Sequence, residues 1–301
     1  MDTLRNENQG GIVMVVQHNL PAINANNQMT KNVSFTTKST EKLSSGFRIN
    51  RAGDDAAGLA ISEKMRGQIR GLDTATRNAQ DGISLIQTAE GALQETHSIL
   101  QRMRELAVQS ANGVYEDEVD RENIQNEFDN LIAEIDRIGD STKFNGISLI
   151  DGNLDGDGSG EALKFQVGAN GNDFEIVELN VASMKSDAIG ADDTDTIKSL
   201  ENTGVSTQDA AKDALAVIDG AINAVSSQRG GLGALQNRLE YTINNLTATS
   251  ENLTAAESRI RDTDMAKEMM EYTKYSILQQ ASQAMLAQAN VQPQSVLQLL
   301  G

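Results

Sequence analysis

The stretch that decides the fold is residues 81–107, DGISLIQTAEGALQETHSILQRMRELA. Apolar and small side chains recur here at steps of three and four, at Ile86, Ala89, Leu93, Leu100, Met103 and Ala107, with Thr96 filling one position. This spacing puts the side chains on one face of an α-helix and is typical of a coiled-coil seam. A helix over 79–107 would be about 43 Å long, so the stretch predicts a rod that needs partner helices along its length.

Two further stripes of the same kind follow. The second comes after the break SANGVYEDE (110–118) and contains Ile124, Phe128, Leu131, Ile135 and Ile138. The third contains Leu232, Leu235, Leu239, Thr242, Leu246, Thr249, Leu253, Ala256 and Ile260, with a looser start at Ala214, Ile218, Ala221 and Val225. A large apolar side chain left in water forgoes roughly 1.5–3 kcal/mol. We therefore expect a mainly α protein, an elongated antiparallel helical bundle or coiled coil formed by the N- and C-terminal arms.

The middle of the chain departs from helix. Glycine, aspartate and asparagine interrupt residues 139–195, and ALKFQVGANGNDFEIVELNV (162–181) alternates as a strand does around Asn170–Gly171. An Asn-Gly pair between alternating segments indicates a tight hairpin turn. We expect a small β-hairpin region within a short variable segment, about 140–203, that joins the two helical arms.

The two ends of the chain carry weaker helical patterns. Residues 16–47 and 265–300 have helically spaced apolar positions diluted by polar or small residues. Each helix has too little apolar surface to be stable alone. We expect these helices to pair with each other, with copies in other subunits, or with both. Residues 1–13 are polar and contain glycine, which favours a disordered leader or an upstream start over a functional arm.

Composition excludes several classes of protein. The 301 residues carry a net charge of −18, which disfavours nucleic-acid binding. There is no cysteine or tryptophan, only two prolines, and 3% aromatic residues. Disulfides and thiolate chemistry are therefore absent, and little interrupts the helices. No run approaches the roughly 18 apolar residues of a membrane span, and the first residues lack the basic and apolar regions of a cleavable signal.

No motif supports catalysis or a cofactor. DGDGSGEALKFQ (155–166) matches the first half of a calcium loop, but Gln166 stands where the bidentate glutamate belongs, which favours a solvated turn. The only histidines are His18 and His97, and no Gly-rich phosphate loop follows a strand. We therefore predict no catalytic, cofactor or metal site, and no enzyme.

The segment KLSSGFRINRAGDDAAG (42–58) is predicted to be a joint between helices. A phosphate loop would need a preceding strand, and a calcium loop would need acids at alternate positions, whereas Asp54 and Asp55 are adjacent. Either aspartate could cap a helix that resumes near Ala56. Three glycines release the backbone: Gly46, Gly53 and Gly58.

LQRMRELAVQSANG (100–113) carries a polar set opposite its seam: Gln101, Arg102, Arg104, Glu105 and Gln109. Taken alone, these residues fit either a solvated face with local ion pairs or a recognition surface.

Several motifs together resemble bacterial flagellin. They are KLSSGFRIN, AGDDAAGLAIS, RNAQDGISLIQTAEGAL, LQRMRELAVQSAN, FNGISLI and FQVGAN, followed by LGALQNRLEYTINNLTATSENLTAAESRIRDTDMAKEM and VLQLL. They occur in order and cover nearly all of 14–301, as in a short form that lacks the large outer variable domains. RNAQDGISLIQTAEGAL and LQRMRELAVQSAN favour flagellin over the alternative, a hook–filament junction protein.

The resemblance implies a homopolymer, the flagellar filament that serves motility. Residues 14–56 with 261–301 would form inner-tube terminal helices, and 57–260 a rod domain. Arg48, Arg51 and Asp54 would contact neighbouring subunits. The terminal polymerisation residues would be Leu20, Ile23, Val33, Ile277, Ala284, Val291, Leu297 and Leu300.

It also implies a set of partners outside the filament. The chain would be secreted by the flagellar type III export apparatus with an export chaperone and a cap protein, and would join hook-associated proteins. In flagellins recognised by the host flagellin-sensing Toll-like receptor, the contact positions match Gln101, Arg102, Leu106, Ile124 and Glu127, with Arg102 as the anchor.

Overall fold

The computed structural model describes residues 19–116, 119–155, 160–190 and 195–300, except for the side chains of 293–300. Five α-helices dominate it: α1 (Leu20–Ser45), α2 (Ala56–Ser110), α3 (Asp120–Ser141), α4 (Gln208–Arg261) and α5 (Met265–Leu300). The chain divides into two compact units, one of residues 66–254 and one of residues up to 65 together with those from 255 onward. The prediction of a mainly α protein is confirmed.

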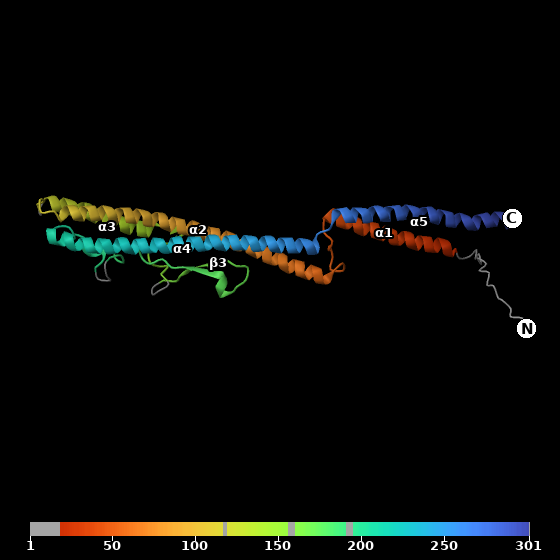
Figure 1. Ribbon diagram of the computed structural model, residues 1–301, viewed down its shortest axis with the longest axis horizontal. Helices are drawn as coiled ribbons and strands as arrows, with labels where there is room; N and C mark the ends of the chain where they lie inside the picture. The colour runs from red at the N-terminus through yellow and green to blue at the C-terminus, as the bar shows by residue number, and fades with distance from the viewer. Residues whose placement is uncertain (1–18, 117–118, 156–159, 191–194, 301) are drawn as a thin grey trace, which may run out of the picture. The chain divides into compact units, whose positions relative to one another are not determined.

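In the unit of residues 66–254, helices α2, α3 and α4 lie side by side (Figure 1). The predicted seam of α2 is buried along its whole length: Ile86, Ala89, Leu93, Leu100, Met103 and Ala107 are fully inaccessible, and Thr96 is 1% exposed. Thr96 satisfies its hydroxyl within the helix by donating to the carbonyl of Ala92. The seam prediction is therefore confirmed, and the three predicted stripes share one core.

The third stripe is buried only in part. Leu232 and Leu239 are buried, and Leu246 is 8% exposed, whereas Leu253 and Ile260 are half-buried. The helix itself continues without a break through the glycines of RGGLG and ends at Arg261. The periodicity thus predicted the helix correctly, while burial weakens toward its C-terminal end.

The turn between α2 and α3 is organised by one buried guanidinium. Arg121, 4% exposed, donates from Nε to the carbonyl of Ser110 at 2.9 Å, from Nη1 to that of Tyr115 at 2.7 Å and from Nη2 to that of Asn112 at 2.9 Å. The last carbonyls of a helix have no partner within the helix and carry partial negative charge. Arg121 donates to the carbonyl of Ser110 at the end of α2, and through the carbonyls of Asn112 and Tyr115 it ties the turn to α3.

The strands differ in part from the prediction. Strand β3 (Leu163–Gln166) pairs antiparallel with β4 (Ile176–Leu179), which confirms the β-hairpin region. Their connection is not a two-residue turn at Asn170–Gly171, however, because it runs over 167–175 and includes the 3-10 helix η1 (Asp173–Glu175). The carboxylate of Glu175 accepts hydrogen bonds from the backbone N–H and the side-chain amide of Asn170. Asn170 therefore does not form the two-residue hairpin turn that the sequence predicted.

The tight Asn-Gly turn lies elsewhere. Asn145 and Gly146 have φ of 50° and 82°, and they join β1 (Lys143–Phe144) to β2 (Ile147–Ser148). Both central residues of such a turn need positive φ, which glycine and asparagine tolerate best. Between these strands and α4, irregular chain and the 3-10 helix η2 (Ile197–Leu200) add apolar side chains to the same core: Leu149, Ile150, Val181, Ile189, Ile197 and Val205.

In the other unit, α1 and α5 lie alongside each other (Figure 1). Asn19 caps α1 by accepting the Ala22 N–H at 3.2 Å, and Gly46 ends the helix in the left-handed conformation. Asp264 caps α5 by accepting the N–H groups of Ala266 and Lys267. Within the described residues, no helix is both long and apolar enough to cross a membrane.

We predict that Leu100→Ala lowers the free energy of unfolding by about 2–5 kcal/mol, because it leaves a cavity in the fully buried seam. Val108→Ala on the same helix is the control, since Val108 is half exposed and its truncation should cost no more than about 0.5 kcal/mol. Urea unfolding followed by circular dichroism measures both. Equal losses in the two variants would contradict the assignment of the seam.

Candidate functional site

The pairing of α1 with α5 depends on polar and aromatic contacts. Asn32 Nδ2 donates to Ser282 Oγ at 3.0 Å, and Asn19 Nδ2 donates to the carbonyl of Ala289 at 2.8 Å. The rings of Phe35 and Tyr275 stack with their centroids 5.0 Å apart. Such contacts align two helices but bury little apolar area.

One ion pair belongs to the same seam. Lys42 Nζ lies 3.7 Å from Glu268 Oε2, and Glu268 is only 8% exposed. It is the one buried side chain among the described residues of α5, and α1 buries only Ala22 and Ser39. The pair of helices therefore has almost no apolar core of its own.

Large apolar side chains on this pair face solvent instead. Of the predicted polymerisation residues, Leu20, Ile23, Val33, Ile277, Ala284 and Val291 are all exposed, Leu20 and Ile277 by about 60%. Leu297 and Leu300 lie outside the described side chains. On α5, six exposed apolar residues lie on one side of the helix, with the polar Lys274 and Gln288 among them; these six are hereafter the α5 stripe: Met270, Ile277, Ala281, Ala284, Met285 and Val291. They follow helical spacing, and the side chains that meet α1, among them Glu268, Tyr275 and Ser282, project from the other side of the helix.

Residues 46–55 connect α1 to α2, as predicted. The N–H of Arg48 donates to the carbonyl of Arg261 at 2.6 Å, and its guanidinium donates to that of Ile260. Phe47 pairs with Asp262 in a single bridge, and the guanidinium of Arg261 lies 4.5 Å above the Phe47 ring. The connection is thus attached to the last residues of α4 and to Asp262 just after it, a contact that the local sequence does not predict.

The two adjacent aspartates have different partners. Asp55 Oδ1 accepts the N–H of Gly58 at 2.8 Å, so Asp55 is the residue that caps α2. A Cβ on Gly58 would lie 2.4 Å from Asp55 Oδ2, which is why glycine is needed there. Asp54 Oδ2 instead accepts the N–H groups of Arg51 at 3.1 Å and Asn50 at 3.3 Å.

The predicted contact residues of this joint also have partners within the chain. Arg51 Nε lies 2.9 Å from Glu41 Oε1, an exposed ion pair. The hydrogen bond from the Arg51 N–H is the largest cause that lowers the pKa of Asp54, and the charges of Lys38 and Lys42 add to it. The joint is therefore built from its own hydrogen bonds and ion pairs.

The predicted receptor residues divide into exposed and buried ones. Arg102 bridges α2 and α3: its Nη2 lies 2.8 Å from Glu127 Oε1, and its Nη1 lies 3.1 Å from Glu105 Oε2. These hydrogen bonds, with Glu127 first, raise the pKa of Arg102. Gln101 is also exposed and contacts His97. Leu106 and Ile124, at 2% and 8% exposure, lie in the core beneath this face.

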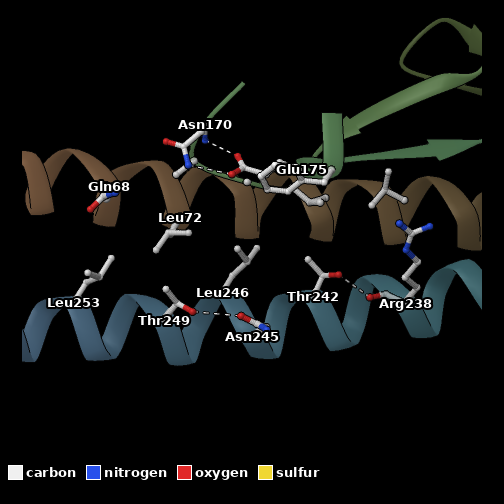
Figure 2. A pocket seen from close by; sticks show the side chains of 15 residues that line it. Gln68, Leu72, Asn170, Glu175, Arg238, Thr242, Asn245, Leu246, Thr249 and Leu253 are labelled. Carbon is white, nitrogen blue, oxygen red and sulfur yellow. Dashed lines mark hydrogen bonds between the residues drawn. The ribbon is translucent and has the colours of Figure 1, made fainter. Parts of the chain in front are cut away.

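A shallow groove of about 340 Å³ lies between α2, α4 and the β3–β4 connection. Figure 2 shows Leu72, Leu246 and Leu253 in it, with polar side chains beside them. Its carboxylate, Glu175, accepts hydrogen bonds from the N–H and the side chain of Asn170, and the pKa of Glu175 is lowered chiefly by the side chain of Asn170. Glu175 thus closes the connection and is not free to act on a ligand.

The remaining candidates from the sequence do not form a metal site among the described residues. Most of the turn that resembled a calcium loop, 156–159, lies outside the described residues, and β3 begins within its second half. Among the residues that the structure describes, no group of three or more His, Cys, Asp or Glu could hold a metal ion. Long helices with buried seams and paired chain ends define a helical structural protein.

Comparison with known proteins gives the family. The bacterial flagellin N-terminal helical region matches residues 16–155, and the bacterial flagellin C-terminal helical region matches residues 215–300. Flagellin of Bacillus subtilis strain 168 is 57% identical over 306 residues, covering 95% of this chain and 100% of that protein. Flagellin of Halalkalibacterium halodurans is 57% identical over 287 residues with the same two coverages.

A solved structure described as a flagellar hook-associated protein from Vibrio parahaemolyticus matches with a TM-score of 0.57 and 15% identity, covering 69% of this chain and 100% of that one. This likeness shows a shared fold alone. The chain belongs to the bacterial flagellin family, as its motifs predicted, in a short form of 301 residues. The family consists of structural proteins of the flagellar filament and not of enzymes.

We predict that the Arg51 amide proton titrates with Asp54. The folded pKa of Asp54 lies below its ordinary value of 3.8, so its bonds are complete above that pH and are lost as pH falls through the folded pKa. In NMR spectra of labelled chain, the shift of this proton should therefore change with a midpoint below 3.8. Asp54→Asn should abolish the transition, and a midpoint at or above the ordinary value would contradict the hydrogen bond.

Proposed function

We propose that this chain polymerises into a flagellar filament through the exposed face of its paired terminal helices. One observation carries the proposal: helices of 26 and 36 residues pair while leaving their large apolar side chains in solvent. A protein that exposed this surface permanently would be prone to aggregate. Copies of the same surface would bury it in a polymer, which matches what a flagellin family member is built to do.

In this proposal the two units have different tasks. Residues 14–56 with 261–301 form the inner tube, and residues 57–260 form the rod around it. The sparse burial of α1 and α5 supports this assignment, because such helices complete their packing only when neighbours are present. Arg48, Arg51 and Asp54 lie at the joint between these segments, where they would meet neighbouring subunits.

The proposal extends to secretion and to the flagellar partners. A chain without cysteine and with two prolines can be threaded unfolded through a narrow channel and refold without disulfide or many isomerisation steps. This composition supports export to the outside of the cell by the type III apparatus, with a chaperone and cap protein. It equally suits a hook–filament junction protein, which would join the filament without extending it.

We predict that Ile277→Asp slows elongation of filament seeds about tenfold or more, because assembly would bury a charge without a partner. Gln283→Glu is the matched control: it adds one negative charge at an exposed position of the same helix, outside the α5 stripe. Electron microscopy of seeded reactions measures filament length. If both variants elongate like the parent chain, the stripe is not the contact; if the parent itself fails to extend seeds, the junction protein is favoured.

We further propose that the free chain is a ligand of the host flagellin-sensing Toll-like receptor. Support comes from Arg102, whose guanidinium is half exposed and held in place across two helices by Glu127. An arginine whose orientation is already fixed loses less entropy on binding and is a frequent hot-spot residue. Because Leu106 and Ile124 are buried, the direct contact would come from Gln101, Arg102 and Glu127.

We predict that Arg102→Ala weakens binding to the receptor ectodomain by more than about 1 kcal/mol. Arg104→Ala is a close control, since Arg104 is equally exposed on α2 but pairs at 2.8 Å with Asp219 of α4, on a different face. Calorimetric titration of the monomer compares the two variants. Unchanged affinity in Arg102→Ala, or an equal loss in both, would overturn the assignment.

A further inference from the structure

The methionines of this chain are distributed unevenly. Among the described residues, Met103 and Met184 are buried, at 0% and 4% exposure. The four methionines that are about half exposed or more all lie on α5: Met265 at 48%, Met269 at 50%, Met270 at 68% and Met285 at 65%. Among the described residues the most exposed methionines are therefore on one helix, whereas Met29 and Met65 are half-buried.

These thioethers are also the groups most open to mild oxidation. The sequence contains no cysteine and no tryptophan, so no thiolate competes for an oxidant. Susceptibility to oxidation follows exposure of the sulfur, and the sulfoxide converts a flexible apolar side chain into a polar one. Met270 and Met285, the two most exposed, should therefore react well before the buried pair.

Met270 and Met285 lie on the surface that is proposed to pack against a second copy of the chain. Both belong to the α5 stripe, where Met270 precedes Ile277 by seven residues and Met285 follows Ala281 by four. The neighbouring members of the stripe, Ile277, Ala281 and Ala284, are aliphatic, while the polar side chains of Lys274 and Gln288 lie one helical turn from Met270 and Met285 respectively. A flexible thioether suits an adaptable apolar contact, whereas the polar sulfoxide oxygen costs free energy when it is taken from water into an apolar contact.

We propose that Met270 and Met285 are oxidation sites of the unassembled chain, and that their conversion to sulfoxides by a peroxide prevents the α5 stripe from packing on a second copy. The sulfur lone pair attacks one oxygen of hydrogen peroxide, the O–O bond breaks, and the second oxygen leaves as water after proton transfer. Sulfur is oxidised by two electrons and the peroxide is reduced. This inference rests on the proposed function, in which packing in the filament covers both sulfurs. Oxidation would then regulate only the subunits that are not yet assembled.

The first experiment measures the modification alone. Monomeric chain is treated with hydrogen peroxide for increasing times, and peptide mass spectrometry follows the gain of one oxygen at each methionine. Met270 and Met285 should be oxidised at least about tenfold faster than Met103 and Met184, since reactivity follows exposure. Equal rates at all four positions would overturn the proposal. Preassembled filaments should show slow oxidation at Met270 and Met285, and rates unchanged from those of the monomer would also contradict it.

The second experiment measures the consequence by seeded elongation. Peroxide should stop elongation of the parent chain, and treatment with methionine sulfoxide reductases should restore it. The Met270→Leu/Met285→Leu variant should elongate with or without peroxide, because leucine conserves volume and cannot be oxidised. Met270→Gln/Met285→Gln, which places a polar side chain at both positions, should fail without any oxidant, provided circular dichroism shows unchanged helix content.

Met265→Gln/Met269→Gln is the matched control, since these exposed methionines lie on α5 outside the stripe, and it should elongate normally. Elongation of fully oxidised parent chain would overturn the inference, as would loss of elongation in the leucine variant after peroxide. If untreated parent chain does not extend seeds, the proposed function fails together with the predicted effect on assembly. The mass spectra then still decide whether Met270 and Met285 are the oxidation sites.

Discussion

The rest of the structure depends on the burial of the α2 seam by α3 and α4. A single helix with one apolar face cannot remain ordered alone in water, because most helical stability in proteins comes from packing of that face. The seam residues between Ile86 and Ala107 are inaccessible only because two other helices and apolar side chains from the described chain between β2 and α4 lie against them. The same core requires Arg121 to close the turn at the end of α2, since the carbonyls there would otherwise lack partners.

The two units of the chain differ in how far they bury their apolar side chains. Residues 66–254 complete a core within one chain, whereas α1 and α5 pair through an ion pair, amide hydrogen bonds and one ring stack. Charge follows the same division: residues 66–254 contain 14 Lys and Arg against 32 Asp and Glu, while the remainder contains 11 of each. The acidic unit favours solubility, and the neutral unit can approach its own copies without net repulsion.

Much of the fold was predictable because its signals are local. The seam of α2, the break after Ser110, the joint at 46–55 and the bounds of α5 all follow from periodicity, glycine placement and capping residues. The turn at Asn170–Gly171 was predicted wrongly because Glu175, five residues away, competes for the Asn170 amide. Local propensity could not reveal that competition, nor that the tight turn would form at Asn145–Gly146 instead.

The burial of residues on the candidate surfaces could not be predicted from local sequence. The family resemblance grouped Leu106 and Ile124 with Arg102, but only packing decided that they are buried while Arg102 pairs with Glu127 at the surface. The attachment of Arg48 to Ile260 and Arg261, and of Phe35 to Tyr275, joins residues more than two hundred positions apart. The sequence by itself determined the helices, their apolar faces and the family, because these depend on spacing along the chain. The tertiary structure alone decided which faces are covered and which, like the α5 stripe, remain open, because burial depends on partners that spacing does not specify.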